Sequence, residues 1–105
     1  MKNMSVLKVT KNNFNEIKNS TKPVLLDFYA DWCGPCQRVA PIVHEISEEY
    51  PQYVVGKVNV DEEMELASAF SVVSIPMLVV MKDGKVAAKE VGFRGKEDIL
   101  DLLEG

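Results

Sequence analysis

Cysteine, histidine and tryptophan are scarce in this sequence of 105 residues, which contains two cysteines, one histidine and one tryptophan. A structural zinc site takes four ligands, and two cysteines with one histidine are too few to form one without a second chain. With 47% hydrophobic residues, a chain of this length buries a core without disulfide staples. We therefore expect one domain that spans residues 1–105.

Long apolar runs and clustered basic residues are also lacking. No run approaches the length of a membrane span, and Met1–Ser5 lacks the apolar segment of a signal peptide, so we expect a cytoplasmic protein without a membrane partner. The 12 lysines and arginines are outnumbered by 16 acidic residues, giving a net charge of −4. Nucleic acid is not an expected partner, because phosphate binding requires clustered Lys and Arg.

The two cysteines lie three positions apart in the segment Trp32-Cys33-Gly34-Pro35-Cys36. Residues at this spacing are one helical turn apart, so the sulfurs come within bonding distance if the pair opens a helix. Pro35 fits only in the first turn of that helix, which places Cys33 at or near the N-cap. The free N–H groups and the dipole there favour a thiolate. We expect Cys33 to be the nucleophile and Cys36 to resolve the mixed disulfide that it forms.

Two other interpretations of the cysteine pair are less consistent with the sequence. Zinc would need ligands from a second chain, because His44 follows Cys36 by eight residues on the same predicted helix and points elsewhere. We assign His44 to the helix surface, without a catalytic role. A purely structural disulfide would close a very small loop, which removes little chain entropy, and a chain without a signal peptide implies a reducing compartment. The spacing therefore indicates thiol–disulfide exchange.

Hydrophobic periodicity predicts an α/β fold in which about five strands form a mixed sheet between about four helices. The Thr10 side chain is a plausible N-cap for the first helix, Pro41 should kink the second, and Asp83-Gly84 should close a two-residue hairpin. A right-handed crossover makes the second and third strands parallel. The cysteine motif then lies beyond the carboxyl end of the second strand, where active sites of such sheets gather. The expected strands cover about 6–9, 24–30, 54–60, 77–81 and 86–88, and the helices about 10–19, 34–49, 62–70 and 95–103.

Asp27 is the only charged residue in the strand predicted at 24–30, which is otherwise apolar apart from the Tyr29 hydroxyl. Burial of an ionised carboxylate is unfavourable and raises its pKa. Six residues before a reactive cysteine, this indicates a proton acceptor, with a hydrogen-bonded structural aspartate as the alternative. Lys57 lies in the middle of the neighbouring strand. It is either the charge partner of Asp27 or a lysine whose ammonium group reaches solvent.

Together these features resemble the thioredoxin family over nearly the whole chain. The resemblance implies a thioredoxin fold, a monomer and a protein-disulfide reductase that binds no cofactor. Its partners would be disulfide-containing protein substrates and a thioredoxin reductase, which passes on electrons from NADPH. A ferredoxin-linked reductase is the alternative. Asp27 would assist deprotonation of Cys36, with Lys57 beside it. The matching positions are Asp27, Trp32 to Cys36, Pro41, Lys57, Asp61, Ile75-Pro76, Asp83-Gly84 and Gly92.

The resemblance also implies a substrate-binding surface around Cys33. The Ile75-Pro76 bond is expected to be cis, although only about 5 to 6% of such bonds are, and the Ile75 backbone would hydrogen-bond an extended substrate. Met77 follows the proline, where many family members have threonine. Val60, Val91 and Phe93 are alternatively core residues. The expected apolar collar consists of Trp32, Gly34, Pro35, Val60, Ile75, Pro76, Val91, Gly92 and Phe93.

Two alternative functions remain open at this point. A disulfide oxidase or isomerase is disfavoured by Pro35, where such enzymes usually have histidine, and by the missing secretion signal. The direction of transfer depends on small differences in stability, since about 30 mV corresponds to roughly 1.4 kcal/mol. A non-catalytic binding subunit of the thioredoxin-like type is disfavoured because both cysteines are present.

Overall fold

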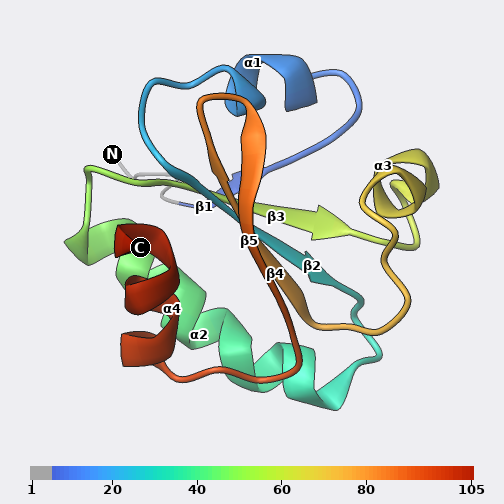
Figure 1. Ribbon diagram of the computed structural model, residues 1–105. Coiled ribbons are helices and arrows are strands. Elements are labelled where there is room, and N and C mark those ends of the chain that lie inside the picture. The colour runs from blue at the N-terminus through green and yellow to red at the C-terminus, as the bar shows by residue number, and fades with distance from the viewer. Residues whose placement is uncertain (1–5) are drawn as a thin grey trace.

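The computed structural model describes residues 6–105, which form one mixed sheet of five strands with helices on both faces (Figure 1). Met1–Ser5, whose composition argued against a signal peptide, lie outside the described residues. The order of elements agrees with the prediction. In sequence these are β1 (Val6–Lys8), α1 (Phe14–Lys18), β2 (Val24–Tyr29), α2 (Gly34–Glu49), β3 (Val54–Asn59), α3 (Met64–Ala69), β4 (Met77–Lys82), β5 (Lys85–Val91) and α4 (Lys96–Glu104).

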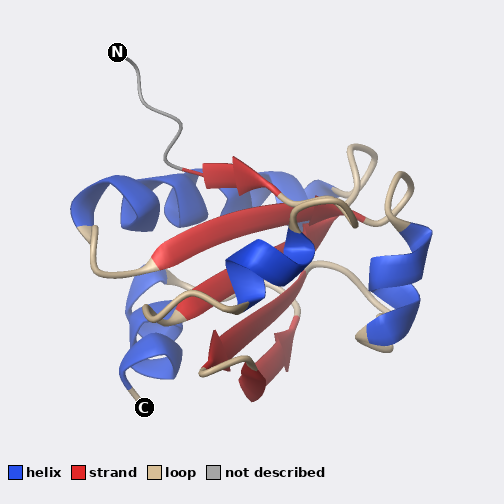
Figure 2. Cartoon of the chain, turned by 90° about the horizontal axis from the view of Figure 1, so that it is seen from above, coloured by secondary structure: helices blue, strands red, loops and turns tan. Residues whose placement is uncertain are grey.

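The strands lie in the order β1-β3-β2-β4-β5, with β2 at the centre. As predicted, β2 and β3 run parallel, and β4 lies antiparallel to β2 on its other side. Figure 2 shows the sheet from above, with helices on either side of the strands. A central strand covered on both faces needs apolar residues throughout, and five of the six residues of β2 are buried.

Alternation along β2 decides which helices each side chain meets. Leu26 and Phe28 pack with residues of α1 and α3, whereas Leu25 packs with residues of α2 and α4. Successive residues of a strand point to opposite faces, so Asp27 lies on the face of Leu25, beneath α2. The strand therefore directs its one carboxylate toward the helix that carries the cysteines.

The hairpin between β4 and β5 has the predicted two-residue turn. Asp83 and Gly84 both have positive φ, at 54° and 78°. This is the conformation that a type I′ turn requires, and Asp-Gly is well suited to it.

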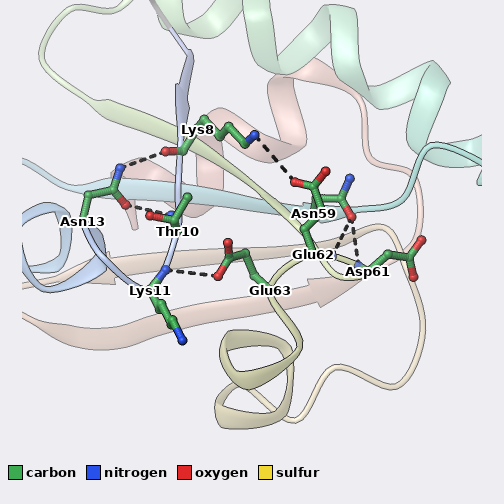
Figure 3. A network of polar contacts seen from close by, with 8 residues as sticks. All are labelled: Lys8, Thr10, Lys11, Asn13, Asn59, Asp61, Glu62 and Glu63. Carbon is green, nitrogen blue, oxygen red and sulfur yellow. Dashed lines mark hydrogen bonds and ion pairs between the residues drawn. The ribbon is translucent and has the colours of Figure 1, made fainter.

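The first helix is shorter than predicted, and its N-cap is Asn13 rather than Thr10. The Asn13 side chain accepts a hydrogen bond from the Thr10 N–H at 2.8 Å and donates one to the Lys8 carbonyl at 2.9 Å (Figure 3). The Thr10 hydroxyl accepts from the N–H of Asn12 at 3.2 Å. These side-chain bonds stabilise a turn over residues 10–13, where the hydrophobic pattern alone predicted helix.

Pro41 lies inside α2, and the kink expected there stays a prediction. His44 is exposed on the same helix, with its Nε2 atom 3.2 Å from the Glu48 carboxylate, so its predicted surface position is confirmed. None of the helices within residues 6–105 has both the length and the apolar character that crossing a membrane requires.

Candidate active site

The two cysteines form a disulfide at the start of α2. Cys33 is the N-cap residue, as predicted, and its Sγ atom accepts a hydrogen bond from the N–H of Cys36 at 3.2 Å. Pro35 occupies the first turn, where its missing N–H leaves no intrahelical bond unmade. The Cα atoms of the two cysteines are 5.2 Å apart. The three-residue spacing therefore brings both sulfurs to the positive end of a helix.

The disulfide lies in a small apolar cluster. Cys33 and Cys36 are both buried and pack against Ala30, Val60 and Ile75. The intervening residues, Gly34 and Pro35, are exposed. A disulfide-bonded partner must therefore make close contact with this surface before one of its sulfurs can reach Cys33.

The segment opposite the disulfide carries the Ile75-Pro76 bond, which is cis, as the resemblance implied. The Ile75 carbonyl oxygen lies 3.8 Å from the Cys33 Sγ atom. Gly92, whose φ of 98° favours glycine, donates its N–H to the Pro76 carbonyl at 2.8 Å. In the part of the chain that the structure describes, no backbone group accepts a hydrogen bond from the Ile75 N–H.

Asp27 is buried beneath α2, and its Oδ1 atom has no hydrogen-bond partner among the groups of residues 6–105. Burial raises the pKa of Asp27 from 3.8 to about 7, against the opposing effect of the Lys57 charge. Asp27 and Cys36 line one cleft of about 200 Å³, which is large enough for several water molecules. The carboxyl group therefore has a pKa near neutral pH and lines the same cleft as Cys36.

Lys57 lies directly opposite Asp27 in the parallel pairing of β2 and β3. Its side chain is exposed, and its Nζ atom lies 6.0 Å from the centroid of the Tyr29 ring. The ion pairs found within residues 6–105 do not include Lys57 with Asp27. The charge of Lys57 lowers the pKa of Asp27 without a direct ion pair, and its role as a charge partner stays a prediction.

Replacing Lys57 by methionine should raise the pKa of Asp27 further above about 7, because the opposing positive charge is lost. An NMR titration of the Asp27 carboxyl carbon measures this value directly. Lys8→Met is the matched control, since Lys8 pairs with Glu62 and should leave the titration unchanged. An identical Asp27 titration in Lys57→Met would contradict the electrostatic role of Lys57.

Trp32 is the most exposed aromatic residue near the disulfide, with 72% of its surface accessible. Its Nε1 atom donates a hydrogen bond to the Asp61 carboxylate at 2.9 Å. Asp61 follows β3, so this bond joins the loop before α2 to the loop before α3. Asn59, which the sequence analysis did not single out, is buried at the end of β3 and accepts from the Asp61 N–H at 2.9 Å (Figure 3).

The other collar residues divide between surface and core. Val91 and Phe93 are exposed, so the surface interpretation holds for both, whereas Val60 is half-buried against the cysteines. Met77 is buried in the core and presents no side chain to a substrate. Within residues 6–105, no cluster of three or more histidine, cysteine or acidic residues could hold a metal ion.

A thioredoxin family model matches residues 5–105. The chain belongs to the thioredoxin family. It is 43% identical to a thioredoxin of Staphylococcus haemolyticus, over 96% of this chain and 97% of that protein. It is 45% identical to a thioredoxin of Mycobacterium tuberculosis, over 94% of this chain and 87% of that protein.

Solved thioredoxin structures have the same fold. A mutant thioredoxin from Halobacterium salinarum superposes with a TM-score of 0.89 at 36% identity, covering 99% of this chain and 93% of that one. Plasmodium falciparum thioredoxin superposes with a TM-score of 0.86 at 35% identity, covering 94% of this chain and 97% of that one. These matches, together with the disulfide at the start of α2, show a thiol–disulfide oxidoreductase of the protein-disulfide reductase type.

Proposed function

We propose that Cys33 attacks disulfides of protein substrates and that Cys36 completes their reduction. The Cys33 thiolate attacks one substrate sulfur, the substrate disulfide breaks, and the other substrate sulfur leaves as a thiolate that takes up a proton. Cys36 then attacks the Cys33 sulfur and releases the second substrate thiol. The substrate gains two electrons and two protons, and the Cys33–Cys36 dithiol becomes a disulfide. The observation that carries this proposal is the N-cap position of Cys33, with the Cys36 N–H directed at its sulfur.

Asp27 is the proposed proton acceptor for Cys36. A thiol must lose its proton to attack, and Cys36 is buried and one turn from the helix end, where the dipole favours a thiolate less. With its pKa raised to about 7 by burial, Asp27 is partly ionised at neutral pH and able to accept this proton. Water in the shared cleft connects the two groups in this proposal. Lys57 acts by keeping the pKa of Asp27 from rising further.

The surface around Cys33 is the proposed binding site for an extended substrate segment. The N–H of Ile75 is without a backbone partner in the described chain and lies beside the carbonyl that faces Cys33, so both are placed to pair with such a segment. The exposed Trp32, Gly34 and Pro35 and the half-buried Gly92 complete the surface, whereas Pro76 is buried next to Ile75. The proposed substrate-binding residues are Trp32, Gly34, Pro35, Ile75, Pro76 and Gly92.

A thioredoxin reductase is the proposed electron donor. The dithiol is consumed in each turnover, so a partner must reduce the disulfide again, and we propose a flavoprotein that draws its electrons from NADPH. The chain then needs no bound cofactor, since the redox-active disulfide itself carries the electrons.

A coupled assay tests this function. The protein is mixed with NADPH, a bacterial thioredoxin reductase and a disulfide-linked two-chain protein, and NADPH oxidation is followed. We expect steady oxidation that requires all components, with His44→Ala as a control that keeps the wild-type rate. Reduction of the substrate with dithiothreitol but not with the reductase would contradict the proposed donor alone. If the protein did not accelerate reduction of the substrate with either electron donor, its proposed function as a protein-disulfide reductase would be contradicted.

A further inference from the structure

Asn59 is a buried polar residue for which the proposed mechanism has no use. It is the last residue of β3 and is 8% exposed. Apart from Asp27, it is the one buried polar or charged residue of the described chain. A buried polar side chain is unfavourable unless it is hydrogen-bonded, so its bonds indicate its role.

Both oxygen atoms of Asn59 hold the turn that leads into α3. The side-chain oxygen accepts from the N–H groups of Asp61 at 2.9 Å and Glu62 at 3.3 Å (Figure 3). The backbone oxygen accepts from the N–H groups of Glu62 at 3.2 Å and Glu63 at 2.8 Å. The side chain is thus the group that fixes the backbone of Asp61.

The fixed residue in turn holds Trp32. The Asp61 carboxylate accepts the hydrogen bond of the indole Nε1–H at 2.9 Å, and Trp32 directly precedes Cys33. An indole with 72% of its surface exposed has little packing to orient it, so this bond is its main restraint. A chain of contacts therefore runs from Asn59 through Asp61 to the aromatic ring beside the disulfide.

The other contacts of the turn after β3 contribute less to holding Trp32 in place. The Lys8–Glu62 ion pair spans 3.7 Å between two exposed side chains, and the Glu63 carboxylate accepts from the exposed Lys11 N–H at 3.1 Å (Figure 3). Exposed pairs of this kind contribute little to stability. Neither of them touches Asp61 or Trp32.

We propose that Asn59 is a positioning residue that acts through Asp61 to hold the Trp32 ring in place for protein substrates. The proposal rests on the proposed reductase function, because Trp32 belongs to its substrate-binding surface. Loss of the side-chain oxygen of Asn59 removes the bond that fixes the Asp61 backbone, and the indole of Trp32 then loses its restraint. The free ring must be ordered again when a substrate binds, which weakens binding and leaves the cysteine chemistry unchanged.

A double-mutant cycle on KM for a disulfide-linked protein substrate tests the proposal. Asn59→Ala and Asp61→Ala should each raise KM about three- to tenfold, the range of one or two hydrogen bonds, with kcat nearly unchanged. Because the two residues act in one chain of contacts, the double variant should be no worse than the weaker-binding single variant. Glu62→Ala is the matched control in the same turn and should keep the wild-type KM. If the increase in KM of the double variant equalled the product of the two single increases, the proposal would be overturned.

Trp32 fluorescence anisotropy gives a second readout that needs no turnover, because this is the only tryptophan of the chain. Asn59→Ala should lower the anisotropy as Asp61→Ala does, and Asn59→Asp, which keeps an acceptor oxygen, should restore it. Unchanged anisotropy in Asn59→Ala would overturn the proposal even if KM rises. If Asn59→Ala does not fold, Asn59→Leu replaces it, since leucine has a similar size and no acceptor oxygen for the Asp61 N–H. If the wild type reduces no substrate, the reductase function fails, and the anisotropy still decides whether Asn59 positions Trp32.

Discussion

Cys33→Ser should lower kcat/KM for disulfide reduction by roughly 1,000-fold or more, because the attacking thiolate is lost. A serine hydroxyl stays protonated at neutral pH, and it cannot form the mixed disulfide through which thiol–disulfide exchange proceeds. The N-cap position that stabilises a thiolate has no comparable effect on an alcohol. The loss is measured in the coupled assay with a disulfide-linked protein.

Cys36→Ser is the matched variant, because it should also lose turnover but at a later step. Its Cys33 still attacks, so a covalent complex with the substrate should accumulate and be visible by mass spectrometry. Cys33→Ser should show no such complex. If the complex accumulated in Cys33→Ser and not in Cys36→Ser, the two cysteines would have the opposite roles.

Asp27→Asn should raise the free energy of unfolding relative to wild type, and this gain should be on the order of 4 kcal/mol larger at pH 8 than at pH 3. The pKa of Asp27 is raised in the folded state to about 7, from 3.8. The folded state therefore binds the proton more tightly than the unfolded state, and the stability of the wild type falls as the pH rises from about 4 to about 7. Asparagine is uncharged, so the stability of the variant does not fall in this way as the pH rises.

Denaturant unfolding of wild type and variant at a series of pH values measures the effect. The difference in free energy of unfolding should grow between pH 4 and 7 and stay constant above that range. Asp31→Asn serves as the control, since Asp31 is exposed and should show no such trend. A difference for Asp27→Asn that does not vary with pH would mean that the pKa of Asp27 is not raised.

The sheet could be predicted from the sequence because burial on one or both faces leaves a direct trace in hydrophobic alternation. The sequence of β2, apolar apart from Asp27 and the Tyr29 hydroxyl, is typical of a strand covered on both faces, and the Asp83-Gly84 pair predicted the hairpin turn. The start of α1 could not be predicted in this way. There, the Asn13 side chain binds backbone groups at Lys8 and Thr10, and these bonds outweigh the helical pattern.

Within the site, local features could be predicted from the sequence, and features that depend on distant parts of the chain could not. The N-cap position of Cys33 follows from the sequence, because Pro35 permits only the first turn of a helix. The cis bond before Pro76 does not follow from base rates and came only from the family resemblance. Asn59 was missed because its bonds depend on how the turn after β3 folds. A polar residue at the end of an apolar strand, two positions before Asp61, was the signal available.

The reduction potential of the Cys33–Cys36 pair tests the central claim most directly. The protein is equilibrated in graded thiol buffers, and the fluorescence of Trp32, the residue before Cys33, reports the redox state. A protein-disulfide reductase requires a potential below that of a glutathione pool at about −220 to −260 mV, and this is the result we predict. A potential well above that range would make the pair an oxidant and contradict the account.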